Sequence, residues 1–216
     1  MKGIAIIDIC GTLYDSNTTF DFLRWRSPGK HRFKRWVSTT LAAKAVNKAS
    51  MVLTGFDLMR AWWVRELSGV TQQELQRSAR AFAEEYLPGR EITEVHQLID
   101  GWREKGYRLV LVSATLDVLA EAIAARLGVE EVHSSQLVYE DRVCKGTLKK
   151  DLLGRKSAVV DPLIRGYGRV AVVTDNTSDW ALLALSTEGY IVSDREHLAF
   201  WEGKTPGNKY SFIMID

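Results

Sequence analysis

The sequence predicts an α/β fold, in which helices cover both faces of a largely parallel sheet and an all-helical segment follows the first strand. Apolar, β-branched runs alternate with amphipathic segments over most of the chain, as in folds built from strand–helix–strand units. The first run, Ile4–Ile7, leads into the acid Asp8, which would stand at the carboxyl edge of that sheet. Residues 17–88 break the alternation and carry helical signals only.

Further apolar runs predict the other strands, the last of them an added edge strand. Their bounds are Tyr107–Val112, Leu137–Tyr139, Val170–Thr174, Tyr190–Val192 and Tyr210–Met214. Helices are predicted where apolar residues recur every three or four positions and a glycine follows. These segments are Glu91–Lys105, Leu116–Leu127 and Asp179–Ser186.

The segment 17–88 is interpreted as a helical cap domain inserted into a core domain made of residues 1–16 and 89–216. Thr18, with Asp21 three positions later, resembles a capping pair at the start of the first cap helix. Thr71 is expected to cap a later helix, and Pro88-Gly89 marks the return to the sheet. A connection of this length is far longer than usual between two strands of one sheet, which is why a separate cap is expected.

The composition is that of an ordinary soluble globular protein. Of the 216 residues, 46% are hydrophobic and 26% charged, and no apolar run approaches the roughly 18 residues that span a bilayer. The chain enters its first strand almost at once, so a signal peptide is not expected. Two cysteines, Cys10 and Cys144, do not indicate a disulfide framework, and the four histidines lack zinc-site spacing. A cytoplasmic protein is therefore predicted, with no indication of its oligomeric state.

Positive charge is concentrated in one part of an almost neutral chain. The net charge is +2, but all the charged residues between Phe22 and Phe56 are Lys or Arg. This distribution argues against wholesale nucleic-acid binding and indicates an anionic ligand or surface. A basic helix from Lys30 to Lys48 allows three interpretations: a solvated face, a lid that attracts a phosphorylated substrate, or a weak contact with an anionic membrane surface. The apolar side of the membrane contact would be formed by Phe33, Trp36 and Leu41.

Two polar motifs follow the first two strands of the predicted sheet. Asp8, followed by Gly11-Thr12, ends the first strand, and an aspartate is a known nucleophile that carries phosphoryl groups. Ser113 follows the second strand and precedes a helix. A hydroxyl and the backbone N–H groups at that edge are able to hold a phosphate oxygen.

Two further motifs bring a cation and two acids. Lys156 stands at the start of a predicted helix, placed to neutralise charge on a transferring group. Asp175 ends a later strand and Asp179 follows four residues on, a pair that suits a hard cation such as Mg²⁺. Taken singly, these residues have ordinary structural interpretations as strand-end turns, helix caps or solvated charges. Their order along the chain favours a phosphoryl-transfer site.

In this order the motifs resemble those of the haloacid-dehalogenase (HAD) superfamily, and more closely its phosphoserine-phosphatase-like branch, over most of the chain outside the cap. The first family motif, DxDxT, is matched by Asp8, Gly11 and Thr12 but carries Cys10 in place of the second acid. The other three are matched by Val112-Ser113-Ala114-Thr115, by Lys156 after Gly154, and by Thr174-Asp175-Asn176-Thr177-Ser178-Asp179. The resemblance implies a Rossmann-like parallel sheet with an inserted helical cap.

The resemblance also implies a role for each matched residue. Asp8 would attack the phosphorus, with Cys10, Ser113 and Lys156 as the other residues at the catalytic positions. The substrate-binding positions implied are Gly11, Thr12, Ser113, Ala114, Lys156 and Asn176. Mg²⁺ would be bound by Asp8, Asp175 and the main-chain carbonyl of Cys10, with Asp179 orienting or supporting that set.

Cysteine at position 10 leaves the outcome of the chemistry open. In the phosphatases of the family the second aspartate protonates the leaving oxygen and then activates water, and such help is typically worth about 10²–10⁴-fold. A thiol with a pKa near 8.5 is a poor substitute near neutrality. Slow cleavage of good leaving groups, transfer to an acceptor other than water, loss of catalysis and cleavage of a different bond all remain open.

The sequence therefore predicts a Mg²⁺-dependent phosphatase or phosphotransferase acting on a small phosphorylated metabolite. The alternative is an inactive module that binds a phosphorylated ligand or a protein partner. Substrate choice is assigned to the cap and to the loop Tyr14–Thr19.

Overall fold

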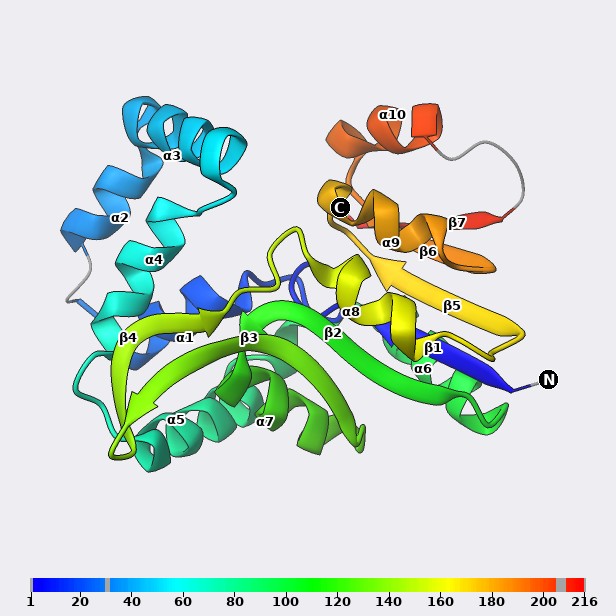
Figure 1. The fold of residues 1–216 in the computed structure, drawn as a ribbon, viewed down its shortest axis with the longest axis horizontal. Coiled ribbons are helices and arrows are strands. Elements are labelled where there is room, and N and C mark those ends of the chain that lie inside the picture. The colour runs from blue at the N-terminus through cyan, green and yellow to red at the C-terminus, as the bar shows by residue number, and fades with distance from the viewer. Residues whose placement is uncertain (1, 30–31, 205–208, 216) are drawn as a thin grey trace.

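A seven-stranded sheet runs through the part of the chain that the computed structural model describes, residues 2–29, 32–204 and 209–215 (Figure 1). The strand order is β4-β3-β2-β1-β5-β6-β7, and every neighbouring pair is parallel except β3 and β4. The strands are β1 (Gly3–Ile7), β2 (Arg108–Leu116), β3 (Glu131–Glu140), β4 (Val143–Lys150), β5 (Arg169–Thr174), β6 (Glu188–Ser193) and β7 (Tyr210–Met214).

Helices connect the strands and cover the sheet. The α-helices are α1 (Thr18–Arg26), α2 (Arg32–Thr39), α3 (Leu41–Thr54), α4 (Leu58–Val64), α5 (Gln72–Glu85), α6 (Thr93–Glu104), α7 (Asp117–Leu127), α8 (Lys156–Leu163), α9 (Trp180–Ala184) and α10 (Arg195–Lys204). Short 3₁₀ helices lie at η1 (Arg65–Leu67), η2 (Pro88–Arg90) and η3 (Thr177–Asp179).

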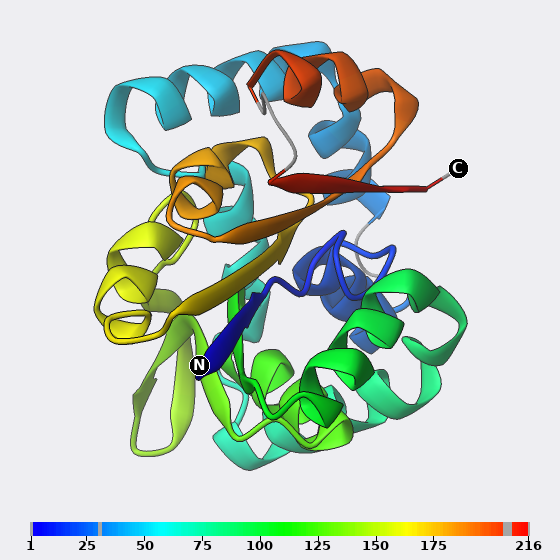
Figure 2. The same cartoon turned by 90° about the vertical axis from the view of Figure 1, so that its right-hand side faces the viewer.

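The central strand β1 is buried on both faces. Ala5 and Ile7 belong to an apolar cluster with α5, α6 and α7, whereas Ile4 and Ile6 belong to a second cluster with α8, α9 and α10. Figures 1 and 2 show these two groups of helices on opposite sides of the sheet. A strand buried on both faces needs apolar side chains at every position, which explains why its sequence is a continuous apolar run and not an alternating one.

The helices between β1 and β2 differ in how much they contribute to the core. Phe22 of α1, Trp63 at the end of α4 and Phe82 of α5 belong to the same apolar cluster as β1. In contrast, α3 contains no buried residue, and α2, α3 and the first part of α4 extend away from the sheet (Figure 1). We refer to these three helices, Arg32–Val64, as the arm.

Most of the predicted elements are confirmed, and one strand was not foreseen. β7 lies at one edge of the sheet as predicted, and Thr71 caps α5 through a bond from the N–H of Glu74. β4 was missed because Val143–Lys150 has no apolar run. Its buried positions are the small residues Cys144 and Gly146, and Cys144 exchanges backbone hydrogen bonds with the segment after η1. The tertiary contact, not local propensity, makes it a strand.

The prediction of one basic helix from Lys30 to Lys48 is wrong within the described residues. α2 ends at Thr39, and the hydroxyl of Thr40 accepts a bond from the N–H of Ala43 to start α3. Because an N-cap residue is not itself helical, the two helices are separate. Residues 30 and 31 and the side chain of Phe33 lie outside the described part of the chain.

Two boundaries also differ from the prediction. β2 continues to Leu116, with an irregular register between Val112 and Leu116, so Ser113 lies inside the strand and not after it. The last predicted helix begins as the turn η3 and becomes α-helical only at Trp180. In the described part of the chain, every helix is too short or too polar to span a bilayer.

Candidate functional site

The polar motifs predicted from the sequence meet at one end of the sheet. β1 pairs with β2 on one side and β5 on the other, so the residues in the last part of β2 and those that follow β1 and β5 share the carboxyl edge. There they line a cavity of about 300 Å³. The predicted residues in its wall are Asp8, Cys10, Gly11, Ser113, Ala114, Lys156, Asp175 and Asn176. Thr12 and Asp179 are buried and lie outside that wall.

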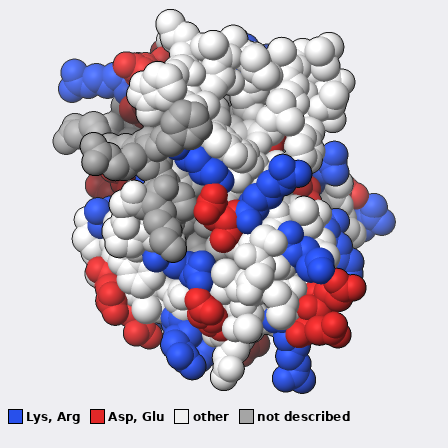
Figure 3. All heavy atoms as spheres, turned by 90° about the vertical axis from the view of Figure 1, so that its left-hand side faces the viewer, with Lys and Arg blue, Asp and Glu red and all other residues white. Residues whose placement is uncertain are grey.

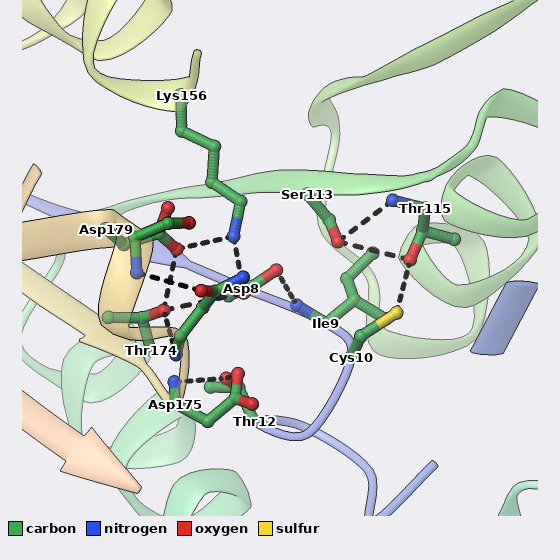
Figure 4. A network of polar contacts seen from close by, with 12 residues as sticks. Asp8, Ile9, Cys10, Thr12, Ser113, Thr115, Lys156, Thr174, Asp175 and Asp179 are labelled. Carbon is green, nitrogen blue, oxygen red and sulfur yellow. Dashed lines mark hydrogen bonds and ion pairs between the residues drawn. The ribbon is translucent and has the colours of Figure 1, made fainter. Parts of the chain in front are cut away.

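Lys156 holds two carboxylates together. Its Nζ donates to Asp8 Oδ2 at 2.5 Å and to Asp179 Oδ2 at 2.6 Å, and all three side chains are buried (Figure 4). Burial alone would lower the pKa of Lys156, but the charges of Asp8 and Asp179 raise it above its usual value. The ammonium group therefore stays charged beside Asp8, and Asp179, which also accepts from Thr174 Oγ1 at 2.8 Å, acts as its anchor.

Asp175 packs directly on the turn that follows β1. Thr12 Oγ1 donates to Asp175 Oδ1 at 2.9 Å and accepts from the N–H of Asp175 at 3.0 Å. Burial, together with the nearby charge of Asp8, raises the pKa of Asp175 to about 7. The carboxylates of Asp8 and Asp175 thus share a poorly solvated site in which nearby positive charge does not fully neutralise them.

Gly11 makes the close approach of Asp175 possible. Its φ of +65° lies in the left-handed region, and a Cβ there would lie 2.3 Å from Asp175 Oδ2. Gly128, at the end of α7, has a similar φ of +63° with open space around it. A substitution at either glycine would strain the backbone, but only a substitution at Gly11 would also bring a side chain into collision with Asp175.

We expect Gly11→Ala to lower the free energy of unfolding by about 1–3 kcal/mol more than Gly128→Ala does, because only the first substitution overpacks its surroundings. Both variants carry the left-handed penalty of about 1–2 kcal/mol. Urea unfolding of the two variants measures the difference. Equal losses of stability would show that Asp175 does not need the space above Gly11.

Cys10 is held in a group of hydroxyls. Its Sγ lies 3.0 Å from Thr115 Oγ1 (Figure 4) and 2.7 Å from Thr18 Oγ1, and these two hydroxyls lie 2.8 Å apart. Ser113 Oγ donates to Thr115 Oγ1 at 3.1 Å. Burial, and then the charge of Asp8, raises the pKa of the Cys10 thiol, so the thiol stays neutral at physiological pH.

This arrangement corrects the predicted capping pair of α1. The cap is Asn17, whose side-chain oxygen accepts from the N–H of Phe20 at 3.5 Å, while the hydroxyl of Thr18 is taken up by Cys10 and Thr115. Asp21 accepts from Ser16 Oγ at 2.7 Å and does not bond back to the helix start. A hydroxyl used in the interior is not available as a cap.

The carboxylates suit a divalent cation. Asp8 and Asp175 offer oxygen donors that hard cations such as Mg²⁺ prefer, and a cation between them would relieve the charge that raises the pKa of Asp175. No group of three His, Cys, Asp or Glu side chains forms a metal site within the described residues, so further ligands would come from the main-chain carbonyl of Cys10 and from water. The Asp179 carboxylate accepts bonds from Lys156 and Thr174 and would therefore support the metal ligands without being one of them.

The arm contributes two residues that the sequence motifs did not indicate. Asp57, the cap of α4, and Arg60 both line the cavity. Arg60 is buried, donates to the carbonyl oxygen of Ala114, and places its Nε 3.6 Å from Asp151 Oδ2. A lone arginine in a helical insertion carries no sequence signal for this position. The loop Tyr14–Thr19, in contrast, supplies several lining residues as expected: Asp15, Ser16, Asn17 and Thr19.

Comparison with known proteins identifies the family of this chain. The family model described as haloacid dehalogenase-like hydrolase matches residues 5–184. Protein CicA of Caulobacter vibrioides is 28% identical over 196 residues, which cover 87% of this chain and 85% of that protein.

Solved structures share the fold at lower sequence identity. A protein of unknown function from Bordetella pertussis Tohama I matches with a TM-score of 0.71 and 18% identity, covering 100% of this chain and 99% of that one. A phospho-aspartyl intermediate analogue of phosphoserine phosphatase matches with a TM-score of 0.62 and 15% identity, covering 95% and 91%. The family match spans most of the sheet and all four motifs, and the chain therefore belongs to the haloacid dehalogenase-like hydrolase family.

Proposed function

We propose that this protein is a Mg²⁺-dependent phosphatase or phosphotransferase that works through an aspartyl-phosphate on Asp8. The observation that carries the proposal is the convergence of Asp8, Ser113, Lys156 and Asp175 on one small polar cavity. Family membership supports a hydrolase, and the phosphoserine phosphatase of similar fold, solved as a phospho-aspartyl analogue, supports the same intermediate.

In the first step, the Asp8 carboxylate attacks the phosphorus of a phosphomonoester. A bond forms between Asp8 and phosphorus, and the bond from phosphorus to the alcohol oxygen breaks. Lys156, kept charged by its two carboxylate partners, neutralises negative charge on the transferring oxygens. Ser113 exchanges its bond to Thr115 for one to a phosphoryl oxygen. When bound by Asp8, Asp175 and the Cys10 carbonyl, Mg²⁺ supplies positive charge that brings two anionic reactants together.

In the second step, water or another acceptor attacks the phosphoryl group on Asp8 and releases the carboxylate. In the phosphatases that this family resemblance implies, an aspartate at position 10 moves the protons of both steps. The Cys10 thiol is neutral and bonded to hydroxyls, so leaving alcohols that need no protonation are the favoured substrates. Hydrolysis of the aspartyl-phosphate is then expected to be the slow step.

The test is phosphate release from a panel of phosphomonoesters with Mg²⁺, using the wild type and Asp8→Asn. We expect release by the wild type, none by the variant, and loss of the wild-type activity when EDTA removes the cation. Thermal unfolding of both proteins controls for folding. Equal rates for the two proteins on every substrate would overturn the proposal.

A second candidate function is a module that binds a phosphorylated ligand without turning it over. The bonding of Cys10 to Thr18 and Thr115 favours it, because position 10 offers no carboxyl group to move protons. A fluoroberyllate adduct on Asp8, detected by fluorine NMR, supports the enzyme. Saturable binding of phosphomonoesters without any adduct supports the module.

A further inference from the structure

The outer face of α3 exposes apolar side chains to solvent. Leu41, Val52 and Leu53 are 85%, 77% and 82% exposed, and at helical spacing they lie on the same side as three alanines and Val46. α3 contains no acidic residue. In the view of Figure 3 the upper part of the molecule, where the arm lies, carries few charged side chains. An apolar surface of this kind on a soluble protein marks an interaction site.

The fold of the arm does not depend on this outer face. The inner face of α3 packs through half-buried residues, and Asn47 accepts from the N–H of Met59 in α4 at 2.9 Å. Trp36, Phe56 and Leu58 extend the exposed apolar surface onto the neighbouring segments. Between the three helices of the arm lies an apolar groove of about 600 Å³.

The basic residues beside this apolar surface favour an anionic bilayer as its binding partner. Lys44 and Lys48 are exposed beside the apolar face, and the chain from Phe22 to Phe56 contains basic but no acidic residues. An apolar helix face bordered by lysines is typical of helices that lie in the interface of anionic membranes. The apolar groups enter the acyl boundary while the lysines contact the lipid head groups.

A further cavity lies beside both the arm and the site. It has about 600 Å³, lies between α4 and β4, and shares the lining residues Leu58 and Trp62 with the groove of the arm. It also shares Asp57, Arg60 and Leu153 with the cavity that contains Asp8 and Lys156. Its wall combines apolar side chains with more basic than acidic residues, namely Arg60, Arg65, Lys149 and Arg155 against Asp57 and Asp151. An apolar surface beside a phosphoryl site suits an amphiphilic ligand that has an apolar chain and a phosphorylated head group.

We propose that the arm docks on an anionic lipid bilayer and that the phosphomonoester which reaches Asp8 is the head group of a lipid in that bilayer. The docking follows from the surface of α3, whereas the substrate class rests on the proposed function. The two parts are tested separately, so that failure of one is distinguishable from failure of the other.

Docking is tested by flotation with vesicles of phosphatidylcholine, with and without phosphatidylglycerol. We expect the wild type to float with the anionic vesicles only, and Val52→Glu/Leu53→Glu to bind more than about tenfold more weakly. Phe200→Glu/Met214→Glu is the matched control, because it adds the same charge at exposed apolar residues outside the arm. Lys44→Gln and Lys48→Gln are each expected to weaken binding by about fivefold.

Docking is overturned if the wild type does not float, or if the control double variant loses as much binding as the α3 variant. Analytical ultracentrifugation without lipid tests the other occupant, a second copy of the chain. A dimer that Val52→Glu/Leu53→Glu converts to monomer assigns the face to self-association and overturns the proposal.

The substrate class is tested with two esters that share one head group, glycerol phosphate in solution and oleoyl-glycerol phosphate in anionic vesicles. We expect kcat/KM to be at least about tenfold higher for the lipid, since docking raises the effective concentration of the enzyme at the surface that holds this ester. The α3 double variant should lose this advantage while its rate on soluble p-nitrophenyl phosphate is unchanged. Equal rates on the two esters overturn the lipid substrate but leave the proposed function standing. Absence of any Asp8-dependent release overturns the proposed function, and flotation still decides the docking.

Discussion

Replacing Cys10 with aspartate is expected to raise the rate of phosphate release by about 10²–10⁴-fold, the usual contribution of a positioned general acid and base. The position is already suited to a carboxyl group, because the hydroxyls of Thr18 and Thr115 lie within hydrogen-bond distance of the cysteine sulfur. Burial and the charge of Asp8, which raise the pKa of the thiol, would act on a carboxyl group in the same direction. An acid that stays protonated near neutrality is what a leaving alcohol requires.

The matched control is Cys10→Asn, which has nearly the shape of aspartate but no proton to exchange. Steady-state phosphate release and the lifetime of the phosphorylated enzyme are measured for all three proteins. We expect only Cys10→Asp to release phosphate faster and to shorten that lifetime. Equal rates for the Asp and Asn variants, with both folded, would show that the site lacks more than an acid at position 10.

Replacing Lys156 with methionine is expected to lower the free energy of unfolding by about 3–5 kcal/mol, the range measured when one partner of a buried ion pair is removed. The variant keeps the aliphatic volume of the side chain but leaves Asp8 and Asp179 buried without their cation. It should also lose phosphate release, because no charge remains to neutralise the transferring group. Urea unfolding and the phosphate assay measure the two effects.

Two further variants show whether the stability lost in Lys156→Met arises from electrostatics or from packing. Lys145→Met removes an exposed lysine whose partner Glu140 is also exposed, and little change of stability is expected there. Adding Asp179→Asn to Lys156→Met should recover part of the lost stability, because it removes one of the uncompensated buried charges. If the double variant is less stable than Lys156→Met, the loss arises from packing and the electrostatic explanation is wrong.

The residues of the candidate site could be predicted because each motif depends on local sequence. A parallel strand must be apolar along its length, so Asp8 and Asp175 stand out as polar residues where β1 and β5 end. The strand order was less accessible, and β4 was missed, because Val143–Lys150 becomes a strand only through its contacts with β3 and with the segment after η1.

Bonding partners far apart in the chain could not be predicted from one sequence. Cys10, Thr18 and Thr115 meet although 97 and 105 positions separate Thr115 from the other two. In the same way, the motif indicated Lys156 among four basic residues around the start of α8, but its bonds to Asp8 and Asp179 are known only from the structure. Arg60 of α4 reaches the site through its bond to the carbonyl oxygen of Ala114 in β2, which nothing near Arg60 in the sequence indicates.

The amino-acid sequence by itself determined most of the strands, the helical segment after the first of them and the four motifs, since apolar periodicity and strand-end polarity depend on a few neighbouring residues. The tertiary structure alone decided that Cys10 is a neutral thiol among hydroxyls, that Lys156 is the anchored cation, and that the outer face of α3 is left uncovered. These three outcomes depend on burial and on distances between remote segments, and both quantities exist only once the chain has folded.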